Sequence, residues 1–229
     1  HETEGREAIS LVDFNRAGAP LIEIVTEPDM RSPYEAIEFL KNLRTQLRYT
    51  GCTECSMEQG TMRADANISL RPVGSKEMNT KVEVKNMNSI RNVGDAIAYE
   101  IVRQAEGLER GEAVVLHTRL WDPEKQVTTP MREKFAGPCV PDPMVPVIRM
   151  DEAWLAVIKG RLPEMPSQKA ERFVTEYELA AGEAAAMSQE REVAEFFEAA
   201  VKRKVAPRQA ANWIITHLLP ALRARGQNL

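Results

Sequence analysis

The chain has 229 residues, of which 43% are hydrophobic and 28% are charged, and its formal net charge is −4. This length allows one large domain or two modest ones. The composition is typical of a soluble globular protein, and no apolar run is long enough to predict a membrane span. The slightly negative charge gives no global basic footprint, so any nucleic-acid contact requires a local patch.

The first residues and the cysteines indicate whether the chain is part of a longer protein and which redox compartment suits it. The chain begins at His1 without an initiator Met or a signal segment, and we interpret it as a piece of a longer protein. Its three cysteines are an odd number, which argues against a disulfide framework and favours a reducing compartment. Cys52 and Cys55 form a CxxC motif, but tetrahedral zinc needs four ligands and Cys139 is far away. We predict free thiols in a turn rather than a zinc site.

The first predicted elements are a strand and a helix. The strand covers Leu21–Val25, is apolar except for Glu23, and ends at Pro28, because proline cannot continue a ladder. The helix begins after the N-cap Ser32 and ends at Gly51. Its expected buried stripe consists of Ala36, Ile37, Leu40, Leu43 and Leu47.

A hairpin follows this helix. Met62–Val73 alternates strictly between apolar and polar residues, as in a half-buried strand whose successive side chains point to opposite faces. A turn leads into Lys81–Lys85, where Val82 and Val84 alternate with polar residues. The two segments are predicted to pair as antiparallel strands.

The rest of the chain predicts a second helix, a second strand pair and then only helices. The helix covers about Ser89 to Glu109, and strands at 113–122 and 126–132 follow it. Four prolines within 136–150 exclude a helix and indicate an extended linker. We therefore predict an α+β domain with a mostly antiparallel sheet at 1–148, followed by the start of an all-helical domain at 149–229.

Four stretches, in one order and with matching gaps, carry a family resemblance: residues 10–36, 57–74, 81–101 and 118–122. They resemble the B subunit of the tRNA-dependent amidotransferase, which converts misacylated Glu-tRNA(Gln) or Asp-tRNA(Asn) into the cognate amide. The resemblance is dense from Ser10 to Asp122 and thinner in the helical part. It implies a cradle-like domain similar to glutamine synthetase, truncated at its N-terminus, and a helical domain without its C-terminal tail domain.

The resemblance also implies a reaction, cofactors and partners. The family uses ATP and Mg²⁺ to phosphorylate the side-chain carboxylate of the tRNA-borne residue, and ammonia then displaces the phosphate. The implied partners are an amidase (glutaminase) subunit that supplies ammonia, a small stabilising subunit and the misacylated tRNA. No membrane is involved, and the implied location is the cytoplasm or an organellar matrix. Because the sequence has no GxxxxGK[ST], a P-loop is excluded and phosphates are expected on a sheet surface.

Three glutamates are implied metal ligands. The family has a metal-binding Glu in its "LIEIV" segment, which matches Glu23, and Glu4 (or Glu2) falls where a further acidic ligand is expected. Glu58 lies in "MEQG", where Gln59 replaces a second Glu of the family. A buried carboxylate is costly unless it is paired or bound to metal. The alternatives are an edge strand that exposes Glu23 and a solvated loop at Glu58.

The polar side of the hairpin supplies the implied catalytic residues. The resemblance assigns Arg63 and Lys85 to phosphate or carboxylate charge, and Asp65 and Glu83 to metal or ammonia handling. The implied hydrogen-bonding and cofactor-binding residues are Asn67, Ser69, Asn88 and Ser89, the last two at a helix start that attracts anions. The alternatives are a cross-strand salt-bridge ladder without ligand and ordinary helix capping.

The helical part contains a basic run, and one segment departs from the family. Contacts with the RNA backbone are implied for Lys202, Arg203, Lys204 and Arg208, and the alternative is a solvated helix face. After Lys134 the chain reads "FAGPCVPDPMVP" in place of an acidic, tyrosine-rich segment. This departure favours a rival interpretation, a non-catalytic tRNA-binding or assembly module. The chain by itself is not expected to catalyse the full reaction.

Overall fold

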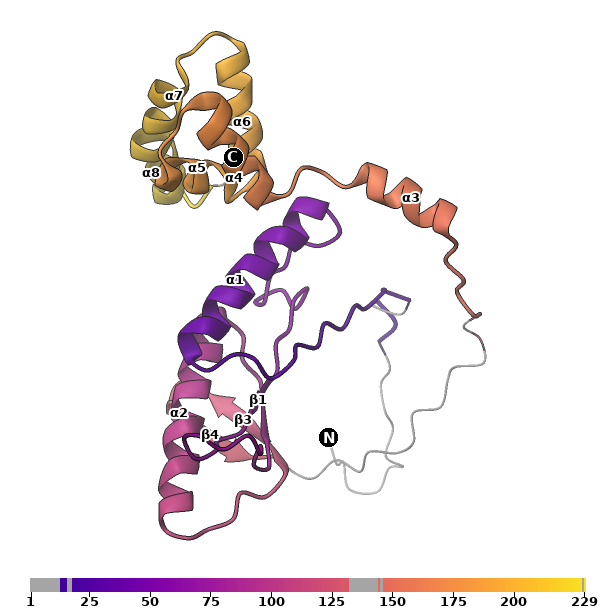
Figure 1. The fold of residues 1–229 in the computed structure, drawn as a ribbon, viewed down its shortest axis with the longest axis vertical. Coiled ribbons are helices and arrows are strands. Elements are labelled where there is room, and N and C mark those ends of the chain that lie inside the picture. Colours follow the sequence, from indigo (N-terminus) through magenta and orange to yellow (C-terminus); the bar gives the residue numbers. More distant parts are fainter. Residues whose placement is uncertain (1–12, 16–17, 132–143, 145, 228) are drawn as a thin grey trace, which may run out of the picture. The chain divides into compact units, whose positions relative to one another are not determined.

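The computed structural model describes residues 13–15, 18–131, 144, 146–227 and 229. The chain divides into two compact units, His1–Arg31 and Ser32–Leu229. The helices and strands of the described residues all belong to the second unit (Figure 1). The predicted domain boundary at residue 148 stays a prediction.

The strand predicted at Leu21–Val25 is wrong. These residues are neither helical nor in a ladder, and the side chains of Leu21 and Val25 are 91% and 81% exposed. A strand needs a partner for its backbone N–H and C=O groups. No described residue pairs with this stretch, so its β-forming composition alone does not make it a strand.

Both helices predicted for the first half are confirmed, together with their caps. Helix α1 covers Pro33–Thr50, and the Ser32 side chain accepts a hydrogen bond from the backbone N–H of Glu35. Gly51 ends the helix with a φ of 72°, a left-handed conformation that glycine adopts without strain. Helix α2 covers Ile90–Glu109 and has Ser89 as its N-cap.

The sheet has four strands in the order β1-β2-β3-β4, namely Ala66–Ile68, Val82–Lys85, His117–Asp122 and Val127–Pro130. The pairs β1–β2 and β3–β4 are antiparallel, as predicted, but β2 and β3 are parallel. The reason is α2, which carries the chain back along the sheet before β3 begins. The α+β class is confirmed, whereas the sheet is mixed and the expectation of a mostly antiparallel sheet is not confirmed.

Helices α1 and α2 pack on one face of this sheet. Apolar side chains from both helices and from the inner face of the strands form one core: Leu40, Ala66, Ile68, Val82, Val84, Met87, Val93, Ala96 and Trp121. Successive strand residues point to opposite faces. The alternating polar residues of β1 and β2 therefore lie on the face that these helices do not cover.

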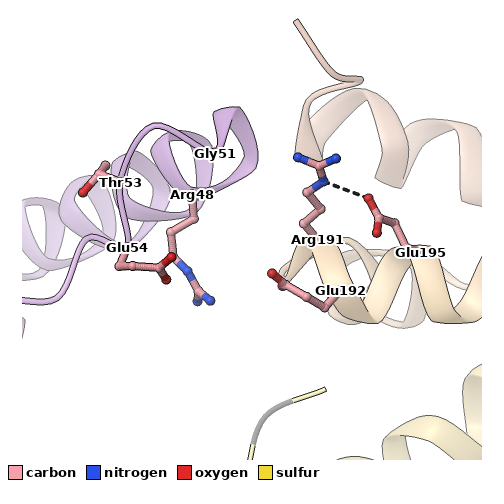
Figure 2. A pocket seen from close by; sticks show the side chains of 7 residues that line it. All are labelled: Arg48, Gly51, Thr53, Glu54, Arg191, Glu192 and Glu195. Atoms are coloured by element: carbon pink, nitrogen blue, oxygen red, sulfur yellow. Dashed lines mark hydrogen bonds and ion pairs between the residues drawn. The ribbon is translucent and has the colours of Figure 1, made fainter.

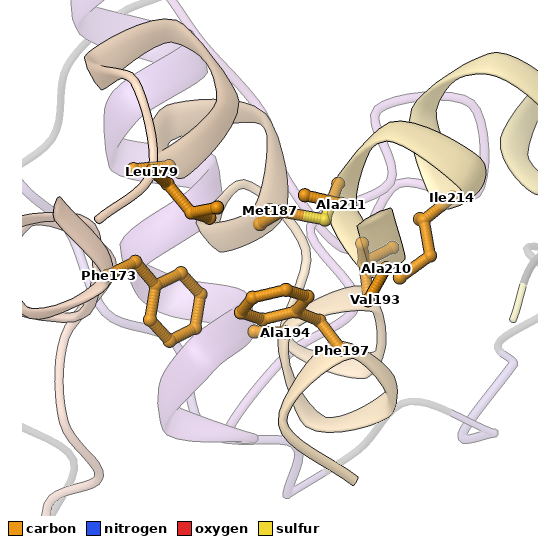
Figure 3. Packing of buried hydrophobic residues seen from close by; sticks show 10 residues of the cluster. Phe173, Leu179, Met187, Val193, Ala194, Phe197, Ala210, Ala211 and Ile214 are labelled. Atoms are coloured by element: carbon orange, nitrogen blue, oxygen red, sulfur yellow. The ribbon is translucent and has the colours of Figure 1, made fainter. Parts of the chain in front are cut away.

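The second half is helical, as predicted. Its helices are α3 Glu152–Arg161, α4 Pro166–Tyr177, α5 Ala181–Ser188, α6 Arg191–Lys202, α7 Pro207–Trp213 and α8 Leu219–Ala224, with a π-helical segment Ile214–Leu218 between the last two. Phe173, Met187 and Phe197 are fully buried at the centre of their core (Figure 3). Residues 146–150 of the predicted linker have no helix or strand. Among the described helices, none has the length and apolar character needed to cross a bilayer.

Candidate active site on the open face of the sheet

The register of the strands brings three of the predicted residues together on the open face. Asn67 of β1 lies opposite Glu83 of β2, and Glu83 lies opposite Thr118 of β3. When the antiparallel register of β1 and β2 is continued by one residue, Asp65 comes to lie opposite Lys85. The alternating pattern thus places two carboxylates and an ammonium group in adjacent rows.

These three charged side chains and one hydroxyl form a cluster on the open face. We call it the outer cluster: Asp65, Glu83, Lys85 and Thr118. The Lys85 Nζ lies 3.1 Å from Asp65 Oδ2 and 3.2 Å from Glu83 Oε1. The Thr118 hydroxyl donates to the other oxygen of Glu83, Oε2, at 2.9 Å. Partial burial lowers the pKa of Lys85, but hydrogen bonds to Asp65 and Glu83 outweigh this and raise it above its ordinary value.

The outer cluster is open to solvent. The side chains of Lys85, Asp65 and Glu83 are 38%, 46% and 32% exposed. An incoming ligand therefore reaches all three groups without a change of the backbone. A cation held between two carboxylates, and able to leave them for a stronger anion, is a suitable arrangement for binding a charged substrate.

Other predicted residues of the hairpin lie outside this cluster. Arg63 and Asn67 are exposed, and Arg63 forms no ion pair with another described residue. The Ser69 hydroxyl donates to the backbone carbonyl of Asn79 at 2.6 Å, across the loop that joins β1 to β2. The structure leaves their assigned roles as predictions.

The two residues predicted at the start of α2 have capping contacts. The Ser89 hydroxyl accepts from the backbone N–H of Asn92 at 3.1 Å, and the Asn88 Oδ1 accepts from the Asn92 side chain. Ordinary capping, the alternative considered from the sequence, is therefore present. Binding of the nucleotide by Asn88 and Ser89 stays a prediction.

The predicted metal ligands fall in different parts of the chain. Glu58 is exposed in a turn, Glu23 is exposed in the first unit, and Glu4 lies outside the described residues. The described residues contain no group of three or more His, Cys, Asp or Glu side chains arranged for a metal ion. Asp65 and Glu83 nevertheless converge on a single cation, the Lys85 ammonium. Such a pair fits Mg²⁺, which binds one or two carboxylates together with substrate phosphates.

A second polar cluster lies on the helix-covered face and was not predicted. We call it the inner cluster: Glu100 and Arg103 of α2, Arg119 of β3 and Thr128 of β4. The Glu100 carboxylate is fully buried and accepts from Arg103 Nε at 2.9 Å and from Arg103 Nη2 at 2.8 Å. Arg119 Nε lies 3.2 Å from Glu100 Oε1 and donates to the Thr128 hydroxyl at 2.7 Å.

Hydrogen bonding decides the protonation state of the inner cluster. Burial alone would raise the pKa of Glu100, but hydrogen bonds from Arg103, Thr128 and Gln104 lower it below its ordinary value. Burial lowers the pKa of Arg119, and the nearby charge of Arg103 adds to this effect. The cluster fixes α2 against β3 and β4, because each of these elements contributes a side chain to it.

Two cavities of the described residues lie away from the outer cluster. One, of about 280 Å³, is lined by Arg48, Gly51, Thr53, Glu54, Arg191, Glu192 and Glu195 (Figure 2). The other, of about 120 Å³, is lined by Arg103, Gln104, Gly107, Glu112, Ala113, Val114, Val115 and His117. Neither of these two includes a residue that the sequence predicts for the site. The charged groups of the outer cluster lie instead on an exposed sheet surface.

Comparison with known proteins identifies the family to which the chain belongs. Residues 1–156 match the family described as the GatB/GatE catalytic domain. The chain belongs to this family. Since the match contains the complete sheet, both polar clusters are parts of a GatB/GatE catalytic domain.

The relatives of this GatB/GatE family member extend over its helical part. The chain is 64% identical over 229 residues to the aspartyl/glutamyl-tRNA(Asn/Gln) amidotransferase B subunit, numbered 1, of Syntrophus aciditrophicus, covering 100% of this chain and 48% of the relative. It is 46% identical over 224 residues to the corresponding B subunit of Thermodesulfovibrio yellowstonii, covering 96% and 47%. It is 44% identical over 223 residues to that of Carboxydothermus hydrogenoformans, covering 96% and 46%. The chain thus spans about half the length of these relatives.

The predicted RNA-binding residues lie at the junction of α6 and α7. Lys202, Arg203, Lys204 and Arg208 are all exposed, and Arg208 Nε donates to the backbone carbonyl of Glu178 at 3.0 Å. A further signal was available in the sequence: residues 199–229 contain no Asp or Glu. The charged side chains of residues 199–229 are therefore all basic, although the chain as a whole has a net negative charge.

Proposed function

We propose that this chain is part of the ATP-dependent subunit of a tRNA amidotransferase and that its outer cluster takes part in the reaction. The subunit would phosphorylate the side-chain carboxylate of misacylated Glu-tRNA(Gln) or Asp-tRNA(Asn) in a cradle-like domain similar to glutamine synthetase. The observation that supports this proposal is the convergence of Asp65 and Glu83 on Lys85 on an open sheet surface within the GatB/GatE domain.

The chemistry has two steps. In the first, an oxygen of the tRNA-borne carboxylate attacks the γ-phosphorus of ATP, the bond to the β-phosphate oxygen breaks, and ADP leaves. In the second, ammonia attacks the carbonyl carbon of the acyl phosphate, and inorganic phosphate leaves with the electrons of the C–O bond. In both steps negative charge builds up on oxygens of a phosphoryl group. Cations in fixed positions stabilise this charge.

In this proposal the outer cluster supplies both the cation and the carboxylates. Lys85 exchanges its contacts with Asp65 and Glu83 for a phosphoryl oxygen. The two carboxylates would then hold Mg²⁺ or take up the proton that ammonia loses. Bound Mg²⁺ would neutralise phosphate charge and orient the phosphates. Arg63 and Asn67, on the same face, are proposed to bind the carboxylate or phosphate of the substrate.

The proposed partners follow from the same family assignment. An amidase subunit would deliver ammonia, and a small subunit would stabilise the complex. The basic junction of Lys202, Arg203, Lys204 and Arg208 is proposed to contact the tRNA backbone without reading its sequence.

Substitution of Lys85 tests this function. In the full-length complex, Lys85→Met should reduce Glu-tRNA-dependent ATP hydrolysis by about 10²–10³-fold, the usual cost of removing a charge-stabilising donor. Lys81→Met is a matched control, because Lys81 is an exposed lysine that precedes the same strand. Equal turnover of the two variants would refute the proposed role of the outer cluster.

One observation favours a second candidate, a non-catalytic tRNA-binding or assembly module. Both carboxylates of the outer cluster are already paired with Lys85, as in a cross-strand salt-bridge ladder that needs no ligand. The full-length protein would then bind tRNA normally but release no phosphate from ATP.

A further inference from the structure

Thr118 is the member of the outer cluster for which the sequence predicted no role. It lies on β3, directly opposite Glu83 in the parallel ladder. Its hydroxyl donates to Glu83 Oε2 at 2.9 Å, while Lys85 holds the other oxygen, Oε1, at 3.2 Å. The two oxygens of one carboxylate are thus held by two different neighbours.

We propose that Thr118 is a positioning residue, which fixes the Glu83 carboxylate so that Glu83 in turn holds Lys85 in place for the substrate. The role of this pair in catalysis rests on the function proposed above. Thr118 itself touches no reacting atom in this proposal, because its hydroxyl is engaged by Glu83. A hydrogen bond to a charged acceptor is strong enough to select one side-chain conformation of a partly exposed glutamate.

The strand that carries Thr118 is held firmly. Its next residue, Arg119, points to the opposite face and is clamped there by Thr128 and Glu100 at 2.7 Å and 3.2 Å. Arg119 Nη2 also donates to the backbone carbonyl of Thr128 at 2.6 Å, which ties β3 to β4 a second time. The inner cluster therefore fixes the strand position from which Thr118 reaches Glu83.

The same face provides a matched residue without this contact. Thr129 of β4 lies opposite Leu120 of β3, in the row next to that of Thr118, and its side chain is exposed. Among the described residues its hydroxyl has no hydrogen-bond partner. Any effect specific to Thr118 must therefore exceed the effect of the same substitution at Thr129.

The experiment compares Thr118→Val, Thr118→Ser and Thr129→Val in the full-length complex. Valine keeps the branched shape that suits a strand but removes the hydroxyl, whereas serine keeps the hydroxyl. The first readout is the rate at which acetic anhydride labels Lys85 without substrate, followed by mass spectrometry with Lys81 as the internal reference. The second readout is Glu-tRNA-dependent ATP hydrolysis.

We expect Thr118→Val alone to raise the labelling rate of Lys85 several-fold, because a Glu83 that is no longer fixed by Thr118 holds the ammonium group less firmly and leaves it mainly to Asp65. We also expect it to lower kcat by roughly tenfold, a loss comparable with one hydrogen bond to a charged group. Thr118→Ser should restore both values, and Thr129→Val should change neither.

The two readouts separate the inference from the proposed function. Unchanged labelling of Lys85 in Thr118→Val overturns the positioning role, whatever happens to turnover. Increased labelling with unchanged turnover means that Thr118 holds the cluster but that the cluster does not act in the reaction. That result would overturn the catalytic part of the inference and the proposed role of the outer cluster, while the ATP-dependent activity of the subunit would stand. Labelling and turnover that change together, with rescue by serine, support both.

Discussion

The two faces of the sheet carry polar clusters of opposite character. On the helix-covered face, the Glu100 carboxylate is fully buried and its charge is met by Arg103 and Arg119. On the open face, the Asp65 and Glu83 carboxylates share the Lys85 ammonium and are 46% and 32% exposed. A buried charge must be paired for the protein to fold, whereas a half-exposed one is free to exchange partners. We therefore propose that the inner cluster serves stability and that the outer cluster serves binding.

The largest expected effect is on stability, at the inner cluster. Glu100→Ala should lower the free energy of unfolding by about 3–5 kcal/mol, because it leaves the buried Arg119 without its carboxylate. Asp65→Asn, in the outer cluster, should lower it by less than about 1 kcal/mol, because exposed ion pairs contribute little. Urea denaturation followed by circular dichroism gives both values.

This pair of variants also tests the separation of roles. Glu106→Ala is the control for α2, since Glu106 is exposed on the same helix as Glu100. If Asp65→Asn destabilises the chain as much as Glu100→Ala does, the outer cluster is a structural salt-bridge ladder, and the two clusters do not differ in role.

Lowering the pH should reduce the contribution of the inner cluster to the free energy of unfolding. Glu100 has a lowered pKa in the folded chain, because hydrogen bonds from its neighbours outweigh the effect of burial. The unfolded chain therefore takes up this proton at a higher pH, near the ordinary glutamate value of about 4.3. The contribution of Glu100 is complete above that pH and is lost as the pH falls through the folded pKa.

The measurement is the difference in unfolding free energy between the wild type and Glu100→Gln as a function of pH. The difference should be constant from pH 7 to about 5 and should shrink below that, where Glu100 of the unfolded wild-type chain begins to take up its proton while the folded chain still keeps the carboxylate charged. A difference that stays constant down to pH 3 would contradict the assignment of a charged Glu100.

The smallest expected effect concerns the packing that covers the inner face. A Cβ added at Gly94 of α2 would meet the side chain of Ile37 of α1, with Cγ1 at 2.9 Å, whereas one added at Gly160 of α3 would meet nothing within 4 Å. Gly94→Ala should cost about 1 kcal/mol net, since overpacking exceeds the gain in helix propensity. Gly160→Ala should stabilise the chain by up to about 1 kcal/mol. Thermal denaturation measures both, and equal shifts of Tm would exclude close packing at Gly94.

The sequence predicted the elements that depend on local signals. The caps Ser32 and Ser89 located both helix starts, and the alternation around Asp65 and Lys85 identified a face that the structure confirms. The parallel pairing of β2 with β3 was missed, because strand direction depends on where α2 returns the chain. The inner cluster was missed for the same reason, since Glu100, Arg119 and Thr128 meet only through tertiary packing.

The predicted strand at Leu21–Val25 shows the limit of composition as a guide. Its residues have high β propensity, yet they lie exposed and without a ladder partner among the described residues. Pairing, rather than propensity, makes a strand. The metal role of Glu23, which was tied to that strand, therefore stays a prediction.

We propose that the open face of the sheet binds the nucleotide, and protection of Lys85 from chemical labelling tests this binding most directly. The full-length complex with Glu-tRNA would be labelled with acetic anhydride in the presence of increasing ATP and Mg²⁺, with Lys81 as the internal reference. Our account predicts that labelling of Lys85 falls in a saturable manner while that of Lys81 stays constant. Labelling of Lys85 that is independent of nucleotide, under conditions where the complex hydrolyses ATP, would contradict it.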